Sequence, residues 1–126
     1  MQSKSFLLFI LAVAVLGTAS TLWLPHWSGS MYVLMIVGYF FRGRFLWTLA
    51  AGGLLAIIWL LAALSWDIPN QGLLANRVGT LFGISRGGTW LITAGIGFIL
   101  GFLGTAVGQA LAKVLPQKPP RWSERR

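Results

Sequence analysis

The sequence has no cysteine, one histidine and only two acidic residues among 126 positions. Without cysteine, the chain cannot form disulfides, thiolate metal sites, iron–sulfur clusters or a cysteine nucleophile. His26 is the only histidine, and it has no second histidine or cysteine with which to share a metal ion. We therefore expect no metal site and no cofactor.

Charge of either sign is also scarce. Only 10% of the residues are charged, whereas a soluble domain carries about 25%. Hydrophobic residues make up 56% of a chain that is long enough for one domain. Because so few charges could not cover the surface of a small globule, we expect lipid to be the solvent of this chain.

Four apolar runs divide the chain, at residues 6–24, 27–41, 45–66 and 89–114. A membrane-crossing helix needs about 20 apolar residues, and three of the runs have roughly that length or more. The predicted fold is an all-α integral membrane protein over residues 1–115, a four-helix transmembrane bundle with a short second helix. Residues 116–126 are basic and rich in proline, and they are predicted to form a cytoplasmic tail.

Two of the runs have an alternative interpretation. Residues 27–41 are short enough for a re-entrant or interfacial segment instead of a crossing. Residues 6–24 also have features of a signal peptide, because Lys4 precedes the apolar stretch and residues 17–19 are small, as at a cleavage site. The sequence does not decide whether the first run is cleaved.

The distribution of basic residues orients the bundle. If all four runs cross, only Arg77 and Arg86 lie on one side, and eight basic residues share the other: Lys4, Arg42, Arg44, Lys113, Lys118, Arg121, Arg125 and Arg126. Loops rich in Lys and Arg stay in the cytoplasm, so both termini are predicted to be cytoplasmic, at a bacterial inner membrane. Without the second crossing, the side that holds the N-terminus would lose its excess of positive charge. The basic residues form short clusters beside apolar runs, which fits anionic lipid headgroups and argues against nucleic acid.

Tryptophans support the same arrangement, since Trp and Tyr gather at membrane interfaces. Four of them stand where an apolar run begins or ends on the predicted outer side: Trp23, Trp27, Trp66 and Trp90.

The long outer loop covers residues 67–88. Apolar residues recur at helical spacing over residues 71–84, which predicts an amphipathic helix in the outer headgroup layer, with Gly87 and Gly88 as its stop. The loop also carries the only acid outside the tail, which is expected to pair with one of two arginines in an outer polar cluster: Asp67, Arg77 and Arg86.

A stripe of glycines in the last run is the clearest local pattern: Gly97, Gly101, Gly104 and Gly108. At about 100° per residue, these glycines lie within about 60° of one another around a helix. Such a stripe lets a neighbouring backbone approach closely. We expect packing within the chain against Ala50, Gly53 and Ala56, with a second copy or a partner protein as the alternative.

The predicted inner side carries the residues expected at lipid headgroups: Arg42, Arg44, Lys113, Lys118 and Arg121. Arg42 and Arg44 flank Gly43 in a tight turn, where they act as topology determinants and meet anionic lipids. Gln109 is the most polar residue within a run, and we expect it to form an interhelical hydrogen bond.

These features predict a role without catalysis. Asp67 and Glu124 are expected on opposite sides of the membrane, so no pair of carboxylates can share a site. No ionisable residue lies in the interior of a run, although ion-coupled transport usually needs one. We expect an accessory or assembly subunit of a membrane complex, and a channel or transporter subunit that forms its pathway on oligomerisation is the alternative.

Overall fold

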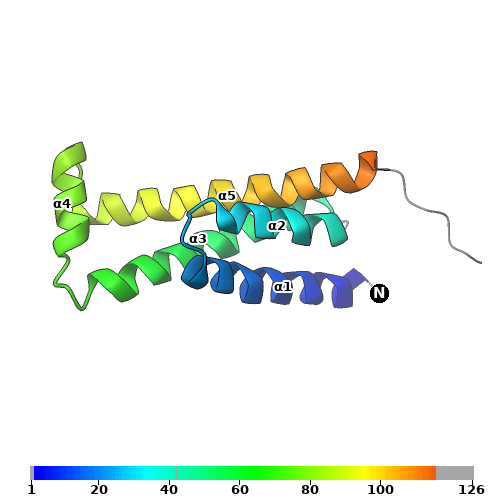
Figure 1. Cartoon of the computed structure of the whole chain (residues 1–126), viewed down its shortest axis with the longest axis horizontal. Coiled ribbons are helices and arrows are strands. Elements are labelled where there is room, and N and C mark those ends of the chain that lie inside the picture. The colour runs from blue at the N-terminus through cyan, green and yellow to red at the C-terminus, as the bar shows by residue number, and fades with distance from the viewer. Residues whose placement is uncertain (1, 42, 116–126) are drawn as a thin grey trace, which may run out of the picture.

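A computed structural model describes residues 2–41 and 43–115, and within these ranges every regular element is an α-helix (Figure 1). The helices are α1 Gln2–Trp23, α2 Gly29–Phe40, α3 Phe45–Asp67, α4 Leu73–Phe82 and α5 Arg86–Val114. Three of them, α1, α3 and α5, are long and apolar enough to cross a membrane. This confirms the all-α class and is compatible with an integral membrane protein.

The ends of α4 and α5 differ from the prediction at one point. Gly87 and Gly88 lie in the first turn of α5 and do not stop α4. The stop is Gly83, whose left-handed backbone (φ +66°) ends α4. Ser85 then starts α5, since its Oγ accepts a hydrogen bond from the Gly88 amide at 3.1 Å.

Helices α1, α2, α3 and α5 run along the long axis of the molecule, and α4 lies crosswise at one end (Figure 1). The N-terminal end of α1 and the C-terminal end of α5 lie together at the opposite end. We call the first the α4 end. The second is the basic end, defined by three exposed residues at helix ends: Lys4, Arg44 and Lys113.

Contacts between the helices fix their register. Helices α1 and α2 are antiparallel, with the Ser20 and Ser30 hydroxyls bonded at 3.1 Å. Helices α1 and α3 are parallel, because the Phe6 ring packs on Trp47 while Gly17, further along α1, lies beside Ile58. Helices α3 and α5 are antiparallel and contact each other from the α4 end, where Asp67 meets Arg86, to the ring contact between Phe45 and Phe102 near the basic end.

The buried core is small and apolar, and its members come from α1, α2, α3 and α5: Phe9, Val13, Leu34, Val37, Ala51, Leu55 and Leu100. Many large apolar side chains on the sides of these helices are exposed, among them Leu8, Leu11, Ile57, Leu61 and Ile99, and only 22% of an 18-residue apolar stretch in α1 and in α3, and 33% in α5, is buried. A water-soluble monomer rarely exposes so large an apolar surface. The sides of the bundle therefore suit a lipid or helical environment.

Candidate functional site

The glycine stripe of α5 is buried and divides between two neighbouring helices. Gly97 and Gly101 face α3. A Cβ atom on Gly101 would lie 2.8 Å from the Ala51 carbonyl oxygen, and one on Gly97 would lie 3.1 Å from the Leu55 carbonyl oxygen. The two backbones touch here because neither glycine has a side chain.

The other half of the stripe faces α2. A Cβ atom on Gly104 would lie 2.6 Å from the Met31 carbonyl oxygen, and one on Gly108 would overlap the Met35 carbonyl oxygen. Gly38 of α2 meets the backbone of Thr105 in the same interface. The short helix α2 is thus held against α5 by close backbone contact rather than by large side chains.

The stripe packs within the chain, but not against all the residues predicted. Its neighbours on α3 are Trp59, beside Gly97, and Ala51, Gly52 and Leu55, which are each one position away from the predicted Ala50, Gly53 and Ala56. A Cβ atom on Gly53 would meet nothing within 4 Å. One residue turns a helix by about 100°, so the prediction chose a different face of α3.

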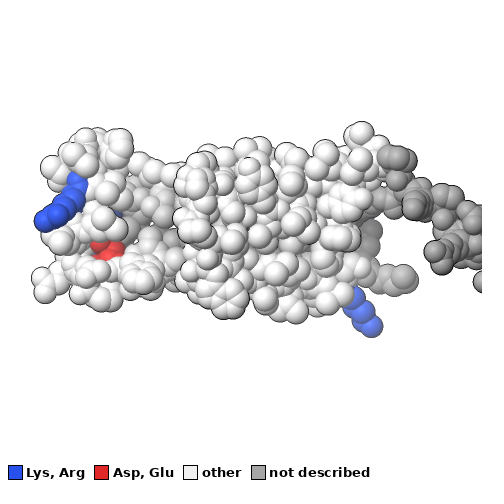
Figure 2. Space-filling view, in the orientation of Figure 1, with Lys and Arg blue, Asp and Glu red and all other residues white. Residues whose placement is uncertain are grey.

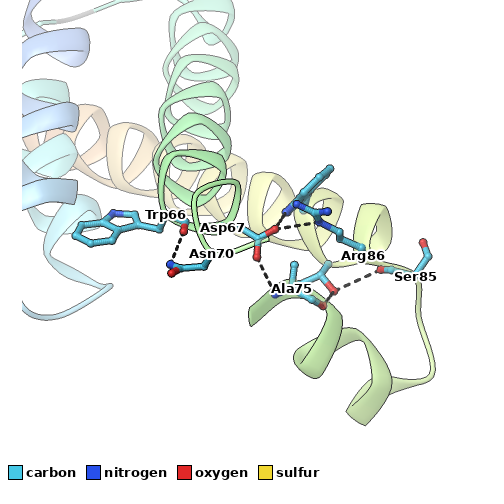
Figure 3. A network of polar contacts seen from close by, with 8 residues as sticks. Trp66, Asp67, Asn70, Ala75, Ser85 and Arg86 are labelled. Atoms are coloured by element: carbon cyan, nitrogen blue, oxygen red, sulfur yellow. Dashed lines mark hydrogen bonds and ion pairs between the residues drawn. The ribbon is translucent and has the colours of Figure 1, made fainter. Parts of the chain in front are cut away.

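The polar cluster at the α4 end centres on Asp67, which is only 3% exposed (Figure 3). Its Oδ1 accepts a hydrogen bond from the Ala75 amide at 3.1 Å. Its Oδ2 accepts one from Arg86 Nε at 3.1 Å and one from Trp90 Nε1 at 3.2 Å. One carboxylate therefore joins the end of α3 to the start of α4 and to the first turns of α5.

Arg86 is fixed on three sides. It pairs with Asp67, and its guanidinium lies 4.7 Å from the centre of the Trp90 ring. It also lies against Gly72, where any side chain would collide with the guanidinium. The Gly72 amide donates to the Asp67 carbonyl oxygen at 2.8 Å, so the loop backbone folds back on the same residue.

Two further contacts hold α4 across the end of the bundle. Thr89 Oγ1 donates to the Ala75 carbonyl oxygen at 3.2 Å. Gly79 lies so close to the chain that follows α4 that a Cβ atom would approach the Ile84 carbonyl oxygen to 2.7 Å. These contacts explain why Ala75 and Gly79 are the buried residues of α4.

The three predicted members of the outer cluster have different roles. Asp67 and Arg86 form the ion pair, whereas Arg77 is exposed on α4 and pairs with no described residue. Sequence reasoning missed Trp90 as a donor, because the sequence places it only at the start of an apolar run. It also missed the Ala75 amide, for which the sequence carries no signal because any residue there offers the same group.

Both oxygens of Asp67 accept hydrogen bonds inside the fold, and the residue is buried. Its three donors take up most of the acceptor sites of a carboxylate. The geometry of this cluster supports a structural role, which is to fix α4 on the ends of α3 and α5.

The predicted headgroup residues lie at the basic end as far as the structure describes them. Arg44 directly precedes α3 and Lys113 lies in the last turn of α5, both exposed. Arg42, Lys118 and Arg121 lie outside the described residues.

Gln109 forms the interhelical hydrogen bond that the sequence predicts. Its Nε2 donates to the Phe41 carbonyl oxygen at 3.4 Å. Phe41 follows the last residue of α2 and has an extended backbone, so its carbonyl oxygen is outside the helical hydrogen-bond pattern. The histidine, His26, is exposed and contacts its neighbours Trp27 and Ser28.

No family model matches the chain, and neither a curated protein nor a solved structure is significantly similar to it.

Proposed function

We propose that the chain is a bacterial inner-membrane protein with four crossings and with both termini in the cytoplasm. The contacts between α1 and α3 supply a common frame. Phe6 and Phe9 both pack on Trp47, and Gly17 lies beside both Leu55 and Ile58, so the contacting residues differ by 38 to 41 positions. These differences set Lys4 level with the start of α3, and they set the last residue of α1 level with Leu61–Leu64.

The length that α1 and α3 share in this frame matches the thickness of a bilayer core. From Lys4 to the end of α1 the rise is about 28 Å, against a hydrocarbon core of about 30 Å. Helix α3 continues for three to six residues past that level, or about 4–9 Å, and ends at Asp67. The ion pair and α4 then belong to the outer headgroup layer.

The second proposed crossing needs more length than α2 supplies. The 12 residues of α2 rise only about 18 Å. Phe41 and Arg44 have extended backbones, and the three steps between them reach up to about 10 Å further. Non-helical backbone within a membrane needs hydrogen-bond partners from the protein, and Gln109 gives one to Phe41.

Helix α4 is proposed to be the interfacial helix. It lies crosswise to the bundle, as a helix in the membrane plane would (Figure 1). Its exposed apolar side chains are Leu73, Leu74, Leu81 and Phe82, and its exposed polar side chains are Asn76, Arg77 and Thr80. The apolar set would rest on the acyl boundary while the polar set faces water.

Within this topology, we propose an accessory or assembly subunit that acts through helix contacts and not through catalysis. The observation that carries the proposal is the division of surfaces in the bundle. The glycines of the stripe pack against α2 and α3 of the same chain and are not open to a partner. Large apolar side chains remain exposed on the sides, among them Leu11 at 59%, Ile57 at 55% and Ile99 at 54%. A partner helix would therefore dock on a lateral face of the bundle.

Photo-crosslinking in native membranes tests this role. A photoreactive residue replaces Leu11, Ile57 or Ile99 in turn, and a control replaces Phe9, which is fully buried. We expect a discrete protein adduct from at least one lateral position and none from the control. Lipid adducts alone from every lateral position would contradict the accessory role.

Reconstitution of the pure chain separates this role from transport. An accessory subunit in liposomes carries no ions or solutes. If the liposomes showed flux, and Gly101→Ile reduced it, the channel or transporter alternative would replace the accessory role.

A further inference from the structure

The basic end of the bundle carries positive charge without compensation. Lys4, Arg44 and Lys113 come from three different helix ends and are all exposed, and none of them pairs with a described residue. The only acid within residues 2–41 and 43–115 is Asp67, at the α4 end and already paired. On the face drawn in Figure 2, acidic atoms appear only at the α4 end.

Backbone donors add to this charge at the start of α3. Arg44 stands in the N-cap position but makes no side-chain hydrogen bond to the helix, and the first turn contains no acid. The first amides of a helix have no partner within the helix, and its N-terminus is electropositive.

The position of these groups matches the headgroup layer. Lys4 is level with the start of α3, which begins at Phe45, in the frame given by the α1–α3 contacts, and this level is one boundary of the proposed apolar slab. Arg44 directly precedes that residue, and Lys113 lies in the last turn of α5. The long stems of lysine and arginine let their charges reach phosphates at such a boundary.

We propose that the basic end binds the headgroups of anionic phospholipids in preference to zwitterionic ones. The proposal rests on the membrane insertion proposed above and names the lipid class that this end recognises. The shared chemistry is a phosphate oxygen that meets Arg44, Lys4 and the amides of Phe45 and Leu46, in a lipid that carries net negative charge; the next amide, that of Trp47, already donates to the Arg44 carbonyl oxygen at 2.8 Å. A zwitterionic headgroup presents the same phosphate together with a cation that the basic end repels.

Lipid titration of the full chain tests the proposal. Purified protein in a neutral detergent is titrated with phosphatidylglycerol or with phosphatidylcholine of the same acyl chains, and bound lipid is counted by native mass spectrometry. We expect phosphatidylglycerol to bind at least about tenfold tighter. Each basic residue near an anionic surface contributes roughly a fivefold factor, so the triple variant Lys4→Gln, Arg44→Gln, Lys113→Gln should lower this preference at least about fivefold, even though Arg42 and the basic residues of 116–126 stay in place.

Arg77→Gln is the matched control, since Arg77 is an exposed arginine at the other end. It should keep the full preference, and so should Arg44→Lys, which preserves the charge. An unchanged preference in the triple variant, or an equal loss in Arg77→Gln, would overturn the proposal. So would complete displacement of the lipid by soluble glycerol phosphate at millimolar concentration, because the site would then be one for free anions.

Extraction of membranes at alkaline pH separates failure of this inference from failure of the proposed function. A chain that stays in the membrane but lacks the lipid preference contradicts the lipid inference alone. A chain that is released contradicts the insertion on which both proposals rest.

Discussion

Asp67 accepts hydrogen bonds from groups in α4 and α5, and Arg86 adds the opposite charge. The residue is buried, so an uncompensated change there leaves unsatisfied polar groups inside the fold. Arg77 also lies between α3 and α5, on α4, but its side chain is exposed and makes none of these buried contacts. A variant of Arg77 therefore serves as a control for variants of Asp67.

We predict that Asp67→Asn lowers the thermal unfolding temperature in detergent. The variant loses the ion pair with Arg86, and its amide NH₂ faces a donor where the wild type has an acceptor. Arg77→Gln, as the control, should unfold at the wild-type temperature. Equal stability of Asp67→Asn and wild type would show that the cluster does not hold α4.

Gly72 and Gly83 give a second test at the residue scale. Both have left-handed backbones, with φ of +74° and +66°, so alanine at either position should cost roughly 1–2 kcal/mol. Only at Gly72 would the added Cβ also collide with the Arg86 guanidinium, because nothing lies within 4 Å of the position at Gly83. Gly72→Ala should therefore lower the free energy of unfolding more than Gly83→Ala, as measured by titration with a denaturing detergent. Equal losses of the free energy of unfolding in the two variants would show that the Arg86 guanidinium does not lie against Gly72.

At the scale of elements, the packing of α2 on α5 depends on backbone contact. Gly108→Ala should destabilise the bundle by about 1–3 kcal/mol, because its Cβ would overlap the Met35 carbonyl oxygen and force the helices apart. Gly95→Ala is the matched control in the same helix, since its Cβ would meet nothing within 4 Å. It should be neutral or stabilise by about 0.5–1 kcal/mol. The same denaturing-detergent titration compares the two, and a harmless Gly108→Ala would contradict this packing.

The end of α2 depends on a polar contact from α5. Gln109→Leu removes the donor to the Phe41 carbonyl oxygen and should cost about 0.6 kcal/mol, the average for hydrogen bonds between membrane helices, with about 1.7 kcal/mol as the upper end. Ala110→Leu changes the exposed neighbouring position and should be neutral in the same titration. If both variants were equally stable, the α2 crossing would not need this hydrogen bond.

Some elements were predictable because their signal is local in the sequence. The long apolar runs predicted α1, α3 and α5, and the glycine spacing predicted one buried face of α5. The face of α3 was not predictable in the same way. Alanine and glycine occupy both Ala50–Gly53 and Ala51–Gly52, and the choice depends on Leu55, which must also reach the core.

The polar cluster shows the same limit. Because acids are scarce, the sequence points to Asp67 and offers two arginines as its partner. That Arg86 is the partner depends on Ser85, which caps α5 so that the helix begins at Arg86, three residues before the predicted apolar run. That start brings Arg86 and Trp90 within one turn of each other and of the carboxylate. The sequence identifies Ser85 as the residue before α5 only if Gly87 and Gly88 are assigned to the first turn of α5 and not to the end of α4.

For the whole molecule, the central claim is that the chain crosses the membrane four times, including once through the short helix α2. The chain has no cysteine, so each single-cysteine variant carries one thiol. His26 lies before α2 and Arg44 after it, whereas Thr80 follows α3 and serves as the control for an outer position.

Labelling with a membrane-impermeant maleimide in intact cells tests this claim most directly. We predict that His26→Cys and Thr80→Cys label from outside, and that Arg44→Cys labels only after the membrane is opened. Labelling of His26→Cys and Arg44→Cys from the same side would contradict the α2 crossing and with it the four-helix topology.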